Sequence, residues 1–137
     1  MRRPHLVRQT TILLVDNSDV VREITRDLLI EEGYRVLEAN SAEVCLRILE
    51  NQRGAITLLI ADVCMPGTSG PQLARKVSSR YPATRILFIS ASPRELLAQM
   101  LPTSCHFLSK PFTRAELASA VKAALYSADG PPLRKTA

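Results

Sequence analysis

The sequence has no apolar run that approaches the roughly 20 residues needed to cross a bilayer. It also lacks the apolar core of a secretory signal peptide, because its first eight residues include Arg2, Arg3, His5 and Arg8. Its 137 residues leave no room for a second folded domain beside a well-buried core. We therefore expect one compact domain that resides in the cytoplasm.

Cysteine is scarce, and Cys45, Cys64 and Cys105 lie far apart without a CxxC pair. The adjacent Cys105 and His106 have no second Cys/His pair with which to complete a metal site. We expect free thiols that are buried in the fold, and no thiolate metal site.

The net charge of +5 belongs mainly to the two ends of the chain. Residues 1–10 and 128–137 hold five basic side chains and one acidic one, whereas residues 11–127 hold 13 basic and 12 acidic ones. The central part therefore offers no basic stripe for a nucleic-acid backbone. We expect a folded domain over residues 11–127, tails at 1–10 and 128–137, and no DNA-binding domain.

Five short apolar runs rich in Ile, Val and Leu alternate with segments of helical pattern. The runs cover residues 11–15, 34–39, 56–61, 85–89 and 106–109. Continuous apolar runs are typical of strands that are covered on both faces, as in a parallel sheet between two layers of helices. The pattern predicts an α/β fold with five βα units, a doubly wound (βα)5 sheet.

Helix-end signals separate these runs. Gly33 is expected to end the first helix. Three segments resemble N-terminal capping boxes, at residues 40–43, 92–95 and 113–116. In the last helix Leu117, Val121, Ala124 and Leu125 form one apolar stripe, which we expect to pack on the sheet.

Polar side chains directly follow four of the five strands. They are Asp16 and Asn17, Asp62, Ser90, and Lys110. In a parallel α/β sheet, ligands bind beyond the carboxyl ends of the strands, so these residues should share one edge. Carboxylates, an amide, a hydroxyl and an ammonium suit a hard divalent cation together with a phosphoryl group.

The chemistry of these groups indicates phosphoryl transfer to an aspartate. An ionised aspartate can attack phosphorus and form an acyl phosphate. Mg²⁺ held by Asp16 and Asp62, together with Lys110, would offset the repulsion between the anions. Ser90 could then donate a hydrogen bond to the new phosphate.

Three motifs resemble the receiver domains of bacterial two-component response regulators. ILLVD at 12–16 is similar to the family's first strand, DVCMPG at 62–67 to its phosphoacceptor loop, and KPF at 110–112 to its Lys-Pro-Phe motif. The resemblance covers nearly all of residues 11–127. It implies a flavodoxin-like sheet with strand order 2-1-3-4-5 and a cis bond before Pro111.

The resemblance also implies roles for individual residues. Asp62 is the expected phosphorylation site, Lys110 the phosphate-binding lysine, and Ser90 the switch hydroxyl. Phe107 is either the aromatic that changes rotamer in the switch or an ordinary core residue. Cys64 is expected to offer only its backbone carbonyl to the metal.

Asn17 departs from the family, which usually has a second carboxylate at this position. An amide oxygen can still coordinate Mg²⁺ but brings no charge, so we expect weaker magnesium binding. The alternative is a degenerate receiver that acts as an interaction module without phosphate.

The resemblance implies a phosphohistidine donor on a histidine kinase or a histidine phosphotransfer protein. A small-molecule phosphodonor is also compatible with the site. The segment from 65 to 74 is similar to receivers of hybrid histidine kinases. The family's usual partner face corresponds to about residues 93–126. The oligomeric state stays open, and we expect no enzymatic activity beyond the domain's own phosphorylation and dephosphorylation.

Two other classes of α/β protein fit the sequence less well. An aspartate-nucleophile hydrolase would have a second aspartate two residues after Asp62, where this chain has Cys64. A flavodoxin-like cofactor binder would have a Ser/Thr/Gly-rich loop after the first strand, where residues 16–19 are too acidic.

Overall fold

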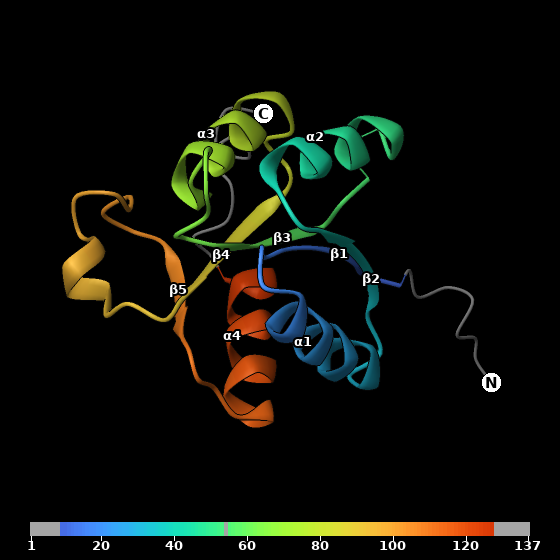
Figure 1. The fold of residues 1–137 in the computed structure, drawn as a ribbon. Coiled ribbons are helices and arrows are strands. Elements are labelled where there is room, and N and C mark those ends of the chain that lie inside the picture. The colour runs from blue at the N-terminus through green and yellow to red at the C-terminus, as the bar shows by residue number, and fades with distance from the viewer. Residues whose placement is uncertain (1–8, 54, 128–137) are drawn as a thin grey trace.

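A computed structural model describes residues 9–53 and 55–127 and contains one five-stranded parallel sheet (Figure 1). The strands are β1 (Thr11–Val15), β2 (Arg35–Ala39), β3 (Leu58–Asp62), β4 (Arg85–Ser90) and β5 (His106–Ser109). The helices are α1 (Asp19–Glu31), α2 (Ala42–Asn51), α3 (Gly70–Arg80), α4 (Arg114–Tyr126) and the 3₁₀ helix η2 (Arg94–Leu97). The sheet order β2-β1-β3-β4-β5 confirms the predicted flavodoxin-like topology.

The sheet separates two layers of helices. Helices α2 and α3 lie on one face, and α1 and α4 lie on the other (Figure 1). Alternate residues of β1 serve the two cores: Leu13 and Val15 pack in the core of the α2 and α3 layer, Ile12 and Leu14 in that of α1 and α4. Burial on both faces explains why the strand sequence is continuously apolar.

The first and last helices end and begin as predicted. Gly33 has a φ of 97°, a conformation that glycine adopts without strain. Its N–H donates to Ile30 while the N–H of Tyr34 donates to Leu29, which is the Schellman arrangement. At α4, Thr113 and Glu116 form the predicted capping box.

The other two predicted capping boxes were wrong. Helix α2 begins after Ser41, whose hydroxyl accepts from Val44 N–H, so Asn40 lies outside the cap. Pro93 precedes η2, which has no side-chain cap. A capping box that we did not predict starts α3, where Ser69 and Gln72 cap each other's backbone N–H groups.

The predicted helix after β4 was also wrong, so residues 9–53 and 55–127 form four α-helices where five were expected. One 3₁₀ turn, η2, stands in its place, and the chain then runs irregularly to β5. Pro93 and Pro102 enclose only eight residues, and the residue before a proline is disfavoured in the helical region. Leu97 and Leu101 still pack against Phe88.

The tails predicted at 1–10 and 128–137 lie outside the described residues, apart from Gln9 and Thr10. None of the helices in the described part of the chain is both long and apolar enough to cross a membrane. Of the three free thiols, Cys45 is buried as predicted, and burial raises its pKa to about 12. The prediction was wrong for Cys64, which is exposed in the loop after β3.

Candidate functional site

The carboxyl ends of β1, β3, β4 and β5 bring the predicted polar residues to one edge of the sheet. The register pairs Val15 with Ala61, so Asp16 and Asp62 follow neighbouring positions on adjacent strands. Ser90 is the last residue of β4 and pairs with Ser109, after which Lys110 leaves β5. Parallel pairing thus gathers groups that are up to 94 residues apart in sequence.

Lys110 connects the two carboxylates. Its Nζ lies 2.8 Å from Asp16 Oδ2 and 3.6 Å from Asp62 Oδ2. Asp16 is 1% exposed and Asp62 is 7% exposed. Two buried carboxylates side by side repel each other, and one ammonium within reach of both offsets that repulsion.

Asp16 is fixed by its own loop and by β2. Its backbone N–H donates to Ala39 O at 3.2 Å, and its Oδ1 accepts from Ser18 N–H at 2.9 Å. Its carbonyl accepts from Arg22 Nη1 at 2.6 Å. Arg22 is in turn paired with Asp19, so the turn from β1 into α1 is tied at several points.

Asp62 sits in a polar pocket that does not fully satisfy its charge. Burial raises the pKa of Asp62, and the nearby Asp16 carboxylate adds to this effect. The Lys110 ammonium and a hydrogen bond from the Cys64 backbone N–H act in the opposite direction. The net direction is upward, so burial prevails over the favourable contacts.

Ser90 lies at the same edge and is 1% exposed. Its Oγ accepts from Ser92 N–H at 3.0 Å, which leaves the hydroxyl hydrogen available for another acceptor. Its carbonyl accepts from Lys110 N–H at 2.8 Å, and the bond between Lys110 and Pro111 is cis, as predicted.

Phe107 is half-buried on β5, next to Phe88 in the register. The guanidinium of Arg94 lies 5.7 Å from the centre of the Phe107 ring. The ring therefore packs against the apolar cluster beneath η2 and is covered by a cation on its outer side.

Comparison with known proteins gives the family. The model of the response regulator receiver domain matches residues 12–122. The chain belongs to this family. The sensor kinase CckA of Brucella abortus (strain 2308) is 36% identical over 121 residues, which are 87% of this chain and 13% of that protein. The response regulator protein FleR of Pseudomonas aeruginosa is 34% identical over 103 residues, 74% of this chain and 21% of that protein.

Solved receiver structures agree with this assignment. The receiver domain of the hybrid histidine kinase CckA has a TM-score of 0.72 and 40% identity, with 85% of this chain and 99% of that chain covered. A signal receiver domain from Pseudomonas fluorescens Pf-5 has a TM-score of 0.78 and 28% identity, covering 86% and 95% of the two chains. The chain spans only a small part of the curated relatives described above.

The donor set of this receiver suits Mg²⁺ only in part. Asp16 and Asp62 offer buried carboxylate oxygens, which Mg²⁺ prefers. Asn17 and Cys64 are exposed beside them, where the Asn17 amide oxygen and the Cys64 carbonyl could contribute. Among the described residues no three His, Cys, Asp or Glu side chains group together.

Two contributors to the receiver site were not among the predicted site residues. Arg22 contacts the Asp16 carbonyl, but the sequence does not distinguish it from Arg26, one turn further along the same helix. Gly70 begins α3 against β3, and a Cβ there would collide with the carbonyl oxygen of Asp62. The sequence offered one indication of this close approach: a glycine in the first turn of a helix, where alanine is more favourable.

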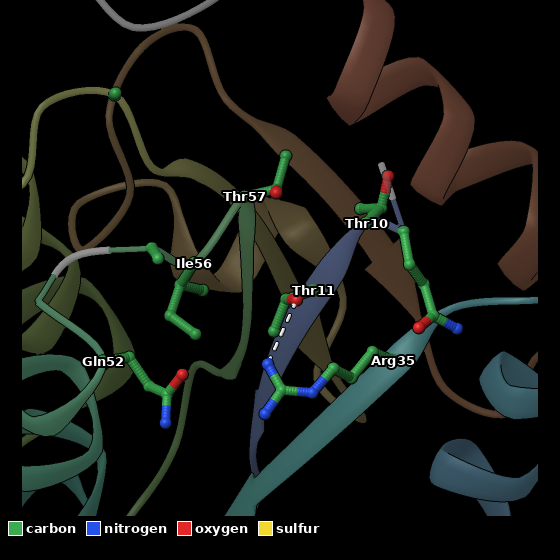
Figure 2. Close-up of a pocket in the computed structure, with 9 residues that line it drawn as sticks. Thr10, Thr11, Arg35, Gln52, Ile56 and Thr57 are labelled. Carbon is green, nitrogen blue, oxygen red and sulfur yellow. Dashed lines mark hydrogen bonds between the residues drawn. The ribbon is translucent and has the colours of Figure 1, made fainter. Parts of the chain in front are cut away.

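A hollow of about 740 Å³ lies at the other end of the sheet (Figure 2). It is lined by Gln9, Thr10, Thr11, Arg35, Gln52, Ala55, Ile56, Thr57 and Ala83. Figure 2 shows the guanidinium of Arg35 directed to Thr11, whose Oγ1 it reaches at 3.5 Å. This hollow has no carboxylate, and it is separate from the edge that carries Asp62.

The pKa of Asp62 leads to a stability prediction. Replacing Asp62 with Asn removes a buried charge beside Asp16, so we expect the free energy of unfolding at neutral pH to rise by on the order of 1 kcal/mol. Urea unfolding followed by far-UV circular dichroism measures this, since the chain has no tryptophan. Glu95→Gln, an equal charge change at an exposed position, is the control and should have little effect.

The pH dependence of this difference has a defined sign. A carboxyl whose pKa is raised in the folded state destabilises the fold above that pKa and ceases to do so below the unfolded value of about 3.9. The stabilisation by Asp62→Asn should therefore shrink as the pH falls through the pKa of folded Asp62. A difference that is constant or grows on acidification would contradict the assignment.

Proposed function

We propose that this receiver domain accepts a phosphoryl group on Asp62 from a phosphohistidine of a partner protein. The placement of Lys110 carries this proposal, because its ammonium is within reach of both buried carboxylates at the sheet edge. A cation in this position can stabilise the negative charge that an incoming phosphoryl group adds.

The reaction transfers phosphorus from nitrogen to oxygen. A carboxylate oxygen of Asp62 attacks the phosphorus, the P–N bond to the donor imidazole breaks, and the imidazole nitrogen keeps the electron pair and takes up a proton. Lys110 pairs with the phosphoryl oxygens, and the Ser90 hydroxyl donates to one of them. The product is an acyl phosphate on Asp62.

Mg²⁺ is the proposed cofactor of this step. Asp16, Asn17, Asp62 and the carbonyl of Cys64 would hold it. When bound, it would supply positive charge beside the phosphoryl oxygens. The Lys110 ammonium now pairs most closely with Asp16, at 2.8 Å. We expect Lys110 to move toward the phosphoryl group when Asp16 binds a metal, since both cations compete for the same carboxylate.

We further propose that phosphorylation is sensed through Ser90 and Phe107. The Ser90 hydroxyl would turn to the phosphate, and the Phe107 ring would follow into the space beside it. The half-buried Phe107 ring under Arg94 is compatible with such a movement. The chain of events links the phosphate to the surface around η2 and β5.

The proposed donor is a histidine kinase or a histidine phosphotransfer protein in the cytoplasm. The similarity to the receiver of CckA, described as a sensor kinase and a hybrid histidine kinase, supports this class of partner. A small phosphodonor such as acetyl phosphate could use the same site. Asn17 favours one competing function, a phosphate-independent interaction module, because the site has one carboxylate fewer than is usual.

Intact-mass measurement after incubation with acetyl phosphate tests the proposed chemistry. With Mg²⁺ present we expect the gain of one phosphoryl group, stable in acid and lost in base, because the product is an acyl phosphate. Asp62→Ala should show no gain, and omission of Mg²⁺ should reduce it. No gain at any magnesium concentration would contradict the proposed chemistry and favour the phosphate-independent module.

Asn17→Asp tests the role of the missing carboxylate. A second charge near Asp16 should strengthen Mg²⁺ binding by roughly 1–2 kcal/mol, about tenfold, as measured by isothermal titration calorimetry. Asn51→Asp, the same chemical change at an exposed position at the end of α2, is the matched control and should leave the affinity unchanged. Equal affinities in wild type and Asn17→Asp would remove Asn17 from the metal site.

A further inference from the structure

Helix α3 carries basic side chains and no acidic ones. Its sequence from Gly70 to Arg80 includes Arg75, Lys76 and Arg80. Within residues 9–53 and 55–127, none of these three makes a salt bridge with a carboxylate, whereas Arg22, Arg26 and Arg114 all do. The described residues carry 13 basic and 12 acidic side chains, nearly a balance, so the excess of positive charge on α3 is a feature of this helix and not of the whole domain.

Two hollows flank these cations. One, of about 590 Å³, lies between α3 and the strands β4 and β5, and Ala74, Ile86 and Phe88 give it an apolar floor. The other, of about 380 Å³, lies toward α2 and is lined by Leu46 and by α3 residues. Both volumes fall in the range of ligand pockets, so each hollow is large enough to hold a side chain of a partner.

The two hollows share one wall. Arg75 and Ser79 line both of them, four residues apart on the same side of α3. Lys76 and Arg80 line the second hollow, and His106 of β5 lines the first. We call this continuous region, from Leu46 across Arg75 and Ser79 to Phe88, the α3 surface.

The larger hollow is bordered in part by the segment between β4 and β5, which has a 3₁₀ turn in place of a helix. Leu97 and Leu101 cover part of Phe88, but Pro102 and Ser104 only border the hollow near the start of β4. In Figure 1 the segment that contains η2 lies out beyond β5 rather than along α3. Ala74 and Phe88 are buried, and the half-buried Ile86 is the accessible apolar side chain of this floor, beside cations that have no acidic partner.

We propose that the α3 surface binds an acidic protein segment that places an apolar side chain in the larger hollow. Carboxylates of that segment would pair with Arg75 and Lys76, while an aliphatic or aromatic side chain covers the half-buried Ile86. Charge of one sign around an apolar depression matches such a segment. A nucleic-acid backbone would leave the apolar floor exposed, and a membrane surface is flat where this region is hollowed.

This surface is distinct from the phosphoryl site. Gly70 at the start of α3 packs against Asp62, whereas Arg75 and Ser79 lie in the second half of the helix. The proposal goes beyond the phosphoacceptor function, and it holds or fails whether or not Asp62 is phosphorylated.

The test is a titration of the ¹⁵N-labelled full chain with a short synthetic peptide of glutamates that contains two leucines. Two control peptides replace the leucines with serine or the glutamates with lysine. We expect amide shifts in α3 and in residues 102–106, and weaker binding as ionic strength rises. Arg75→Glu should weaken the peptide affinity roughly tenfold.

Lys122→Glu on α4 is the matched variant, because it makes the same charge change at an exposed lysine on the opposite face of the sheet. It should change the affinity by less than about twofold. The far-UV circular dichroism spectrum and the urea unfolding midpoint of Arg75→Glu should equal those of the unmodified chain, which verifies its fold independently of peptide binding.

Several results would overturn the proposal. They are no binding of the leucine peptide, equal binding of the serine peptide, and equal weakening by Lys122→Glu. Tighter binding of a DNA duplex or of phosphatidylserine vesicles in the same titration would assign the basic helix to a different class of partner.

Discussion

The contact between the Lys110 ammonium and the carboxylates of Asp16 and Asp62 is the interaction on which the site depends. Without a cation, two buried carboxylates at adjacent strand ends would repel each other and destabilise the fold. Lys110 can reach both only because β5 is placed two strands away from β3 with its end in register with Ser90. The strand order therefore determines whether Lys110 can reach both carboxylates.

The five-stranded parallel sheet, the apolar stripe of α4 and the group of strand-end residues could be predicted because each depends on a short sequence pattern. The strand order came instead from the resemblance to receiver domains. Residues such as Arg22 and Gly70 could not be predicted, since their roles follow from where helices lie against loops in three dimensions. The helix after β4 was predicted wrongly because a capping pattern at residues 92–95 was given more weight than the prolines on either side. A capping pattern alone does not predict a helix when the prolines on either side leave a segment of only eight residues.

The shortened segment between β4 and β5 contacts the proposed switch residue Phe107 and also borders the α3 surface. It carries Arg94 over Phe107, the ring proposed to respond to phosphate. It also borders the hollow in which Ile86 is only half-buried beside the basic helix α3. Receiver domains in the relatives form a small part of longer proteins, so surfaces other than the phosphoryl site are needed to connect a receiver to its neighbours.

The most direct test of the central claim is to locate the phosphoryl group within the chain. Borohydride reduces an aspartyl phosphate to homoserine, and trypsin then separates the two candidate carboxylates. Asp62 is the only acidic residue in the peptide 54–75, whereas Asp16 falls in the peptide 9–22. The account predicts homoserine in the peptide 54–75 alone. Homoserine in the peptide 9–22, or in neither peptide after the phosphorylation reaction, would contradict it.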